Sequence, residues 1–255
     1  MTLVYALVYI YVFIVGIIIG SFLNVCIFRI PKKETIVLGR SHCMTCMHEL
    51  SWKDLFPLFS YIFLRGKCRY CKAPISPRYP IIEALTGVLF LLSVIKFGFL
   101  DLSGILHTVL FCAFFAVLVV VAMIDFDTME IPDRFHIIIL ALGIAAFFIC
   151  PEIGWKERLL GMFIVSVPMF ILAMLGGMGQ GDVKLMLASG LLVGARAVVL
   201  AFFIGCIFAA IFGIVIKIKK KEKQIPFGPF LSIGLVCGSL FGPELVGTYL
   251  SLLSL

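Results

Sequence analysis

The stretch Gly176-Gly177-Met178-Gly179-Gln180-Gly181-Asp182-Val183-Lys184 lies between two long apolar runs and surrounds one carboxylate with four glycines. Between Arg158 and Arg196, only Asp182 and Lys184 carry a formal charge. A charged group at the edge of a bilayer segment is expensive and usually has a function, and glycines let another segment approach closely. The stretch is therefore either a loop with a helix N-cap aspartate or the site of a functional carboxylate at a membrane surface.

The composition is that of an integral membrane protein. Of the 255 residues, 62% are hydrophobic and 14% are charged, whereas soluble domains contain about 25% charged residues. The chain has room for several spans of roughly 20 residues each and for one modest region outside the membrane. No basic segment precedes the first apolar run and no small-residue cleavage site follows it, so we expect no secretory leader.

The apolar runs predict an all-α polytopic membrane protein with about eight transmembrane or membrane-embedded helices. The predicted segments are 3–28, 81–98, 103–124, 135–150, 157–176, 183–194, 197–216 and 229–254. The fourth and sixth segments are short, so we expect them to be tilted, partly re-entrant or buried against neighbours. This pattern divides the chain into a first transmembrane helix (1–28), a polar region (29–80) and a helix bundle (81–255).

The distribution of basic residues predicts the orientation in the membrane. With the N-terminus outside and eight crossings, 17 of the 21 lysines and arginines fall on the cytoplasmic side, as the positive-inside rule requires. The exceptions are Lys96, Lys156, Arg158 and Arg196. Both termini are then outside, and the loops 125–134 and 177–184 lie on the same cytoplasmic side.

The polar region 29–80 contains two Cys-x-x-Cys pairs, which flank 21 residues. The four cysteines are Cys43, Cys46, Cys68 and Cys71. Two thiolate pairs at this spacing can close a tetrahedral Cys₄ zinc site, and a cytoplasmic location disfavours disulfides. A redox pair or disulfide is the alternative. A closed Cys₄ zinc has no open position, so we expect it to hold together a region too small to rely on its own core.

The stretch 55–64 between the cysteine pairs is apolar but too short to span a bilayer. We expect it either to pack beneath the zinc site or to lie along the membrane surface.

Polar residues also interrupt the first two apolar segments. Ser21 and Asn24 lie in the first segment, where such groups usually bond to a neighbouring helix, although they could also form the wall of a substrate site. Glu83 lies just inside the second segment. It either pairs with a nearby basic residue or supports a functional site.

Four acidic residues cluster where the third apolar segment ends, namely Asp125, Asp127, Glu130 and Asp133. Asp125 lies deepest, directly at the end of the apolar run, whereas we expect the other three to face solvent or to cap helices. Pro132 favours a helix start. Pro226-Phe227-Gly228-Pro229 interrupts any helix twice, and we expect it to return the chain to the membrane near the same surface.

Asp125 and Asp182 can work as a pair if they face each other. Two carboxylates in a partly desolvated site share a proton, because both cannot ionise cheaply. The ionised one can take a proton from water, and the protonated one can polarise a peptide carbonyl. That is the chemistry of an aspartic protease, although the pair titrates as a unit and neither residue is assigned one role.

An ordered set of motifs runs over nearly the whole chain. These are Gly20-Ser21-Phe22-Leu23-Asn24-Val25, the two Cys-x-x-Cys pairs, Tyr79-Pro80 with Glu83, Ile124-Asp125 with Ile131-Pro132-Asp133, Gly179-Gln180-Gly181-Asp182-Val183-Lys184 and Pro226-Phe227-Gly228-Pro229. With this set the chain resembles the bacterial type IV prepilin leader peptidases, which are GxGD membrane aspartic proteases.

The resemblance implies a multi-pass enzyme of the bacterial cytoplasmic (inner) membrane whose active site faces the cytoplasm. Its substrates would be type IV prepilins and pilin-like proteins, cut after a glycine and before an apolar helix, and its partners would include the bilayer but no nucleic acid. The catalytic pair of the family corresponds to Asp125 and Asp182. Gly179, Gly181 and Lys184, together with Glu83 and Asn24, are candidate supporting residues.

The resemblance also implies a second activity. Many family members methylate the new N-terminus with S-adenosyl-L-methionine, and the Gly-Lys pair implicated in that step corresponds to Gly66 and Lys67. No cofactor motif of the soluble type is visible in the sequence, so this expectation rests on the resemblance alone.

Two other functions can use carboxylates at a membrane surface. A zinc-stapled transporter or channel could bind a cation or relay protons through Asp125 and Asp182. Such proteins usually show internal repeats and charges at the bilayer midplane, and neither is visible in the sequence. A non-enzymatic assembly factor is the third alternative, and it should tolerate Asp182→Asn.

Overall fold

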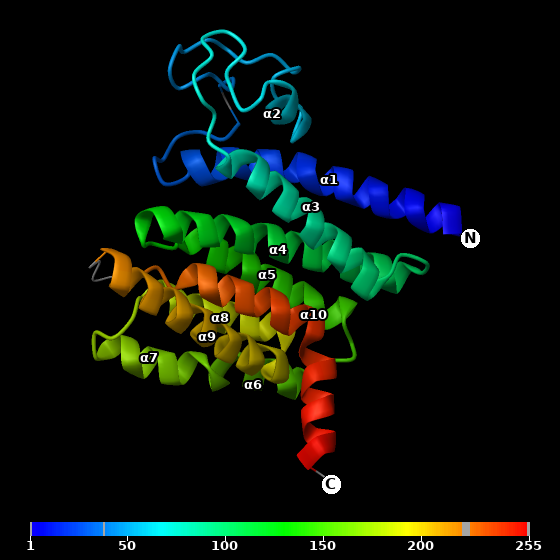
Figure 1. Ribbon diagram of the computed structural model, residues 1–255. Coiled ribbons are helices and arrows are strands. Elements are labelled where there is room, and N and C mark those ends of the chain that lie inside the picture. Colours follow the sequence, from blue (N-terminus) through cyan, green and yellow to red (C-terminus); the bar gives the residue numbers. More distant parts are fainter. Residues whose placement is uncertain (1, 38, 221–224, 254–255) are drawn as a thin grey trace. The chain divides into compact units, whose positions relative to one another are not determined.

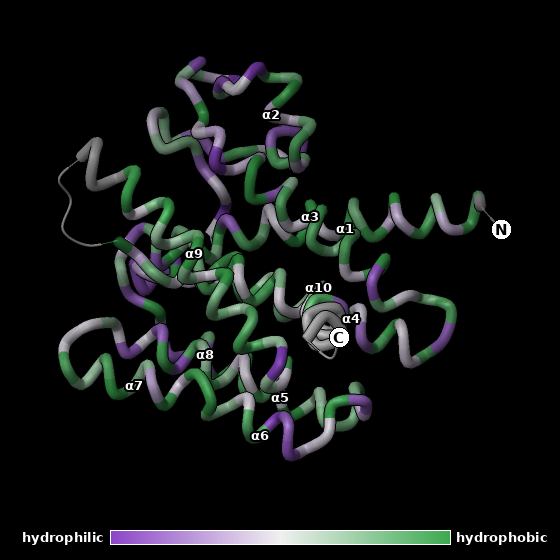
Figure 2. Tube along the Cα trace, turned by 60° about the horizontal axis from the view of Figure 1, so that its bottom comes forward, coloured by the Kyte–Doolittle hydropathy of each residue, from purple (hydrophilic) through white to green (hydrophobic). Residues whose placement is uncertain are grey.

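The protein is described by a computed structural model that covers residues 2–37, 39–220 and 225–253. Within these ranges there are ten α-helices and no β-strand, which confirms the predicted all-α fold class. Contacts divide the chain into two compact units, Met1–Phe99 and Leu100–Leu255. Figure 2 shows that the helices are mainly hydrophobic and that hydrophilic residues collect in the loops and around α2.

Within the described residues, five helical stretches are long and apolar enough to cross a membrane. They are Leu3–Arg29, Arg78–Phe97, Leu102–Thr128, Trp155–Met174 and Ala195–Val215. The protein is therefore a multi-pass membrane protein, whereas the predicted count of eight spans is not confirmed. Lys221, Lys223 and Ser254, which the sequence placed in an inside loop and in the last segment, lie outside the described residues.

The first unit contains α1 (Thr2–Arg29), α2 (Phe59–Phe63) and α3 (Arg78–Phe97). Figure 1 shows α1 and α3 side by side, with the loop-rich region and α2 at one end of the pair. A Cβ added at Gly16 would lie 2.7 Å from the Cα of Gly87, so the two backbones meet at small residues, as membrane helices often do. Asn24 Nδ2 donates a hydrogen bond to the carbonyl oxygen of Tyr79 at 3.2 Å. Asn24 therefore bonds across two helices, which is the first of its two predicted roles.

The second unit is a helix bundle around α8. Its helices are α4 (Leu102–Thr128), α5 (Asp133–Ile149), α6 (Trp155–Ile164), α7 (Ser166–Met174), α8 (Gln180–Val193), α9 (Ala195–Lys220) and α10 (Gly228–Leu253). α8 contacts α5, α6, α7, α9 and α10, and most of its residues are buried. Its 14 residues extend about 21 Å, which is less than the roughly 30 Å of a bilayer core. This short segment is therefore buried against neighbouring helices, one of the three expected arrangements.

The predicted segment 157–176 is two helices, because the chain breaks at Val165 between α6 and α7. Pro168 explains the break. Proline has no N–H to donate, and its ring collides with the carbonyl four residues earlier, here that of Ile164. The hydroxyl of Ser166 instead donates to the carbonyl oxygen of Met162. One apolar run thus forms two helices that both pack against α8.

Arg158 of α6 fixes the ends of α5 and α8. Its side chain is fully buried, and its guanidinium donates to the carbonyl oxygens of five residues at distances between 2.7 and 3.2 Å. These residues are Ala146, Cys150, Ile153, Leu191 and Leu192. Four of them lie at the C-terminal ends of α5 and α8, where carbonyls lack helical partners and the helix dipoles favour a cation. Arg158 thereby joins the two helices at their C-terminal ends.

Candidate active site

Asp125 lies near the end of α4, and its side chain is buried. Its Oδ2 accepts a hydrogen bond from the backbone N–H of Gly228 at 2.9 Å. Gly228 is the first residue of α10, so this N–H belongs to the donors that a helix leaves unpaired at its N-terminus. A Cβ at position 228 would lie 2.8 Å from the same oxygen. The position therefore needs a glycine.

Asp182 lies in the first turn of α8. Its side chain is 8% exposed, and Oδ1 is buried without a hydrogen-bond partner among the described residues. Gly179, not Asp182, is the N-cap residue, so the interpretation of Asp182 as a capping aspartate is wrong. A Cβ at Gly181 would lie 3.2 Å from the Cβ of Ile131, so this glycine lets the start of α8 approach the loop after α4.

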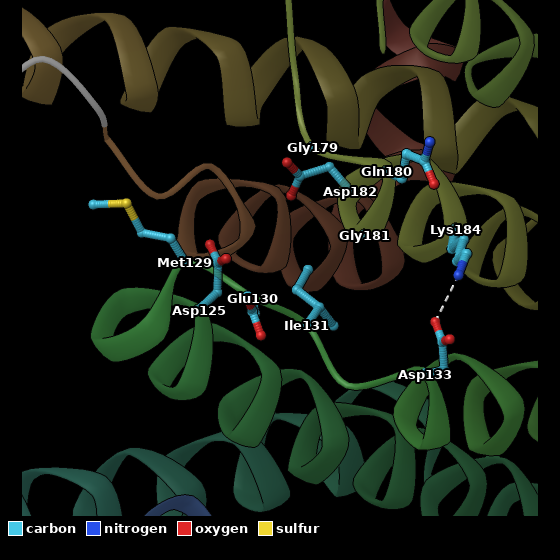
Figure 3. Close-up of a pocket in the computed structure, with 10 residues that line it drawn as sticks. All are labelled: Asp125, Met129, Glu130, Ile131, Asp133, Gly179, Gln180, Gly181, Asp182 and Lys184. Atoms are coloured by element: carbon cyan, nitrogen blue, oxygen red, sulfur yellow. Dashed lines mark hydrogen bonds and ion pairs between the residues drawn. The ribbon is translucent and has the colours of Figure 1, made fainter. Parts of the chain in front are cut away.

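The two aspartates line one cavity of about 300 Å³. Figure 3 shows their carboxylates turned toward the same space, one from α4 and the other from the start of α8. The other lining residues are Met129, Glu130, Ile131, Asp133, Gly179, Gln180, Gly181 and Lys184. The motifs around Asp125 and Asp182, far apart in the sequence, therefore meet at one site, which the predicted topology allows.

Three helix N-termini converge at this cavity, because α5, α8 and α10 all begin there. The N-terminal end of a helix carries a partial positive charge that stabilises nearby anions. This arrangement lets the site hold several carboxylates together. Only one basic side chain, Lys184, is among the residues that line the cavity.

Lys184 is paired with Asp133 rather than with the two buried aspartates. Its Nζ lies 2.7 Å from Asp133 Oδ1, and both side chains are exposed. The hydrogen bond and charge of Lys184 lower the pKa of Asp133. This ion pair links the starts of α5 and α8, and no basic side chain among the described residues pairs directly with Asp125 or Asp182.

The environment separates the two carboxylates chemically. Asp182 lies outside the five helices that are long enough to cross a membrane. Burial, followed by the charge of Asp125, raises the pKa of Asp182 to about 7. Asp125 has a backbone N–H donor, whereas Oδ1 of Asp182 has none in the described part of the chain. The pair is therefore arranged to hold one proton, on Asp182, near neutral pH.

Sequence reasoning did not assign a role to Gly228, and it took His136 to be an interfacial residue. The Pro-Phe-Gly-Pro motif did signal a turn near this surface, but the donor to Asp125 is a backbone N–H that no residue type reveals. His136 lies one turn after Asp133 and is buried, with its Nδ1 3.4 Å from Asp133 Oδ1. Its spacing from Asp133 is the only signal that the sequence contained.

The four cysteines of the paired motifs come together in the first unit. Their Sγ atoms lie within 4.8 Å of one another, and those of Cys43 and Cys71 are 3.7 Å apart. Zn–S bonds of about 2.3 Å in a tetrahedron hold sulfurs about 3.8 Å apart, whereas a disulfide needs about 2.05 Å. All four are free cysteines, so they can hold a zinc ion and do not form the alternative disulfide.

The backbone around each cysteine pair has the same form. The N–H of Cys43 donates to the carbonyl oxygen of His48, and the N–H of Met47 donates to that of Cys43. Met47 has a positive φ of 58°. The second turn repeats this pattern with Cys68 bonded to Ala73, Lys72 bonded to Cys68, and a φ of 61° at Lys72. Two matching turns that each present two thiols support a metal site.

The candidates for methyl transfer and the supporting candidates Glu83 and Asn24 also lie in the first unit. Gly66 has a φ of 68°, and a Cβ there would lie 3.0 Å from the hydroxyl of Tyr61, so its backbone conformation and packing already favour glycine. Lys67 is exposed. Glu83 is buried, and its Oε2 accepts a hydrogen bond from the backbone N–H of Leu58 at 2.8 Å. The side chain of Ser21 is its second hydrogen-bond partner, so among the described residues Glu83 bonds to a backbone group and a hydroxyl and not to a basic side chain.

Two family patterns match the chain. The Bacterial Peptidase A24 N-terminal domain matches residues 14–97, and the Type IV leader peptidase family matches residues 112–214. The first match lies within the first structural unit and the second match within the second unit. No solved structure matches the chain.

Curated relatives are similar over most of their length. A protein of Bacillus subtilis (strain 168) named prepilin leader peptidase/N-methyltransferase is 32% identical, over 94% of this chain and 97% of its own length. An Escherichia coli O78:H11 protein named type 4 prepilin-like proteins leader peptide-processing enzyme is 32% identical, over 86% of this chain and 88% of its own length. A Neisseria gonorrhoeae protein named prepilin leader peptidase/N-methyltransferase is 29% identical, over 86% of this chain and 86% of its own length.

Proposed function

The chain belongs to the type IV leader peptidase family, and we propose that it is a membrane aspartic endopeptidase that removes the N-terminal leader from type IV prepilins and pilin-like proteins. Asp125 and Asp182 are the catalytic residues of this proposal. The observation that carries it is the meeting of two buried carboxylates from separate motifs in one cavity.

The environment of the pair gives each carboxylate a task. Asp125, which accepts the Gly228 N–H at the start of α10, is the ionised member and takes a proton from a water molecule. The water oxygen bonds to the carbonyl carbon of the scissile peptide, while protonated Asp182 donates its proton to the carbonyl oxygen. Collapse of the resulting diol breaks the C–N bond. Asp125 then passes its proton to the leaving amine, and Asp182 recovers one from the diol.

A cleavage assay tests the pair directly. Membranes containing the wild-type protein should shorten a prepilin from the same source by the mass of its leader. Asp125→Asn or Asp182→Asn should lower the rate by about 10²–10⁴-fold, the usual contribution of acid–base catalysis. Asp127→Asn, which changes an exposed carboxylate two residues away, is the matched control and should cleave normally. Cleavage retained by either active-site variant would exclude the dyad.

We further propose that the enzyme lies in the bacterial cytoplasmic membrane with its cavity on the cytoplasmic side and both termini outside. The distribution of lysines and arginines supports this orientation. Cysteine labelling of the loop 125–134 from each side of the membrane would test it. Labelling only from the periplasmic side would contradict it.

A structural zinc ion is the second part of the proposal. Cys43, Cys46, Cys68 and Cys71 would hold it in a closed site, so it would stabilise the region 29–80 and take no part in catalysis. Metal analysis of the purified protein should find one zinc per chain, which Cys71→Ser should lose. Cys237→Ser removes a cysteine that belongs to the second unit and not to the motif, and it should keep the metal. Wild-type protein without zinc would refute this assignment.

N-methylation of the new terminus is the third part. The names of the relatives support it, and the resemblance makes Gly66 and Lys67 the candidate residues. A methyl group would move from the sulfonium sulfur of S-adenosyl-L-methionine to the amine nitrogen, which loses a proton. Lys67→Met should prevent the added methyl mass without preventing cleavage, whereas the exposed Lys53→Met should change neither step.

A further inference from the structure

A strip of exposed apolar side chains lies between the two cysteine turns. It consists of Trp52, Leu55, Phe56, Phe59, Ile62 and Phe63. These residues recur at spacings of three and four, as on one face of a helix, and only Phe59–Phe63 forms the helix α2. The exposed fractions rise to 73% at Trp52 and 81% at Phe63. Six large apolar side chains left open in a region of about 50 residues indicate a contact surface.

The sequence predicted that the stretch 55–64 either packs beneath the zinc site or lies along the membrane surface, and the structure decides between these two arrangements. No residue of α2 is buried, so the strip does not pack beneath the zinc site. Tyr61 faces differently, because it packs on Gly66 at the start of the second cysteine turn. The apolar residues of the strip therefore need a partner outside the cysteine-containing fold.

A hydrogen bond holds the strip at a definite depth along α3. Leu58, in the middle of the strip, donates its backbone N–H to Glu83, which lies five residues after Arg78, where α3 begins. Five residues correspond to about 7 Å of helix. α3 is long enough to cross a bilayer, so this bond holds the strip about 7 Å below the end of the span. Interfacial segments lie about 5–10 Å deep in the same way.

The surroundings of the strip also suit lipid. An exposed apolar row of α3 starts at Ile81, 61% exposed and close to the level of Glu83, so α3 also exposes apolar side chains at the depth of the strip. Exposed Lys53 and Arg65 flank the strip, and basic residues beside an apolar strip favour anionic headgroups.

We propose that the strip is an interfacial anchor that inserts into the headgroup region of the bilayer. It holds the cysteine-containing region against the membrane surface at the start of α3. This inference rests on α3 as a membrane span and does not depend on the proposed peptidase activity.

Photo-crosslinking tests the inference in the full-length protein in membranes. The photoreactive residue p-benzoylphenylalanine is placed at Phe63, and in a separate variant at Phe59, and the adducts are identified by mass spectrometry. Phospholipid adducts should dominate at both positions. The control is the same residue at Val37, which is 85% exposed but outside the strip, and it should give at most a tenth of the lipid adduct. Adducts with residues 100–255 or with another protein, or lipid yields no higher than at Val37, would overturn the proposal.

A second measurement leaves the strip unmodified. The protein has two tryptophans, so Trp155→Phe leaves Trp52 as the only one. Its fluorescence should be quenched at least twofold more by lipids brominated near the headgroup than by lipids brominated near the chain ends. No quenching by either lipid, or stronger quenching by the deep label, would contradict an interfacial position.

Discussion

The two ends of helices α5 and α8 hold buried charge in opposite ways. At the C-terminal ends, the Arg158 guanidinium is fully buried and donates to five carbonyl oxygens. At the N-terminal ends, Asp182 is buried with an oxygen that has no partner among the described residues, and Asp125 accepts one backbone hydrogen bond. Arg158 and Asp182 each lie at helix ends that stabilise their charge, whereas Asp125 lies in the last turn of α4 and is stabilised from the start of α10.

The difference between these ends is hydrogen-bond saturation. Buried polar groups in folded proteins are nearly always bonded, and an unsatisfied one costs about 1–3 kcal/mol. Arg158 meets this rule completely, so we expect it to contribute stability. At the aspartate end, Oδ1 of Asp182 lacks a hydrogen-bond partner among the described residues, and Asp182 lines a cavity. An unsatisfied group beside a cavity is free to bond to a substrate. The comparison predicts that changes at one end alter stability and that changes at the other end alter catalysis.

The largest expected effect is on stability, from Arg158→Met. The substitution leaves several buried carbonyls of α5 and α8 without a donor, which we expect to lower the free energy of unfolding by about 3–5 kcal/mol. Thermal unfolding in detergent would measure the loss, and cleavage per folded molecule should be retained. Arg196→Met is the matched control, because Arg196 is exposed and 3.6 Å from Glu157, and such pairs contribute about 0–1 kcal/mol. An equal loss of stability in Arg158→Met and Arg196→Met would show that the hydrogen bonds of Arg158 do not stabilise the fold.

The next effect is on catalysis, from Gly228→Ala. The new Cβ would lie 2.8 Å from Asp125 Oδ2 and 3.0 Å from its Cγ, so the carboxylate must move. A displacement of about 1 Å can cost about 10²-fold in rate, and kcat/KM for prepilin cleavage would show it. Gly242→Ala in the same helix meets Ala197 at an ordinary 3.4 Å and should cleave normally. Wild-type cleavage by Gly228→Ala would show that this N–H does not position Asp125.

The pH dependence of cleavage gives a third test. Because the pKa of Asp182 is raised to about 7, the pair loses its proton above that pH, and kcat should fall about tenfold per unit. The other charged side chains that line the cavity are Asp125, Glu130, Asp133 and Lys184. A rate that stays constant from pH 7 to 9, with chemistry limiting, would contradict a protonated Asp182.

The titration of Asp182 should also change the stability of the fold with pH. The folded pKa of Asp182 lies above its ordinary value of 3.8, so the folded state binds more protons than the unfolded state between these values. Its contribution to stability is therefore complete below about pH 4 and is lost as the pH rises to about 7. The Tm of the wild type should fall relative to that of Asp182→Asn over this interval and remain parallel to it at higher pH.

The smallest effect is expected at the exposed ion pair between Asp133 and Lys184. Both side chains are more than half exposed, and such a pair contributes about 0–1 kcal/mol. Lys184→Met should therefore lower the Tm by no more than a few degrees and cleavage by about fivefold at most. A loss as large as that of Asp182→Asn would place Lys184 among the catalytic residues rather than in the support of α5 and α8.

Local patterns in the sequence identified the residues on which the proposed chemistry rests. The apolar runs specified a helical membrane protein because each span must bond its own backbone. Pro132 marked the start of α5, and it is the N-cap residue of that helix. The spacing of the cysteines was enough to predict their cluster, since each Cys-x-x-Cys pair lies within one short turn. The depth of Asp125 and the glycines around Asp182 singled out these two aspartates, which both line the cavity.

The tertiary structure alone decided which groups these residues meet. Asp125 is bonded to a backbone N–H 103 residues away, Glu83 to the N–H of Leu58, and Arg158 to carbonyls of α5 and α8. Every residue except proline has an N–H, and every residue has a carbonyl, so residue type cannot reveal these partners. Periodicity and turn residues act over a few positions, whereas the pairing of distant backbone groups depends on how the helices pack.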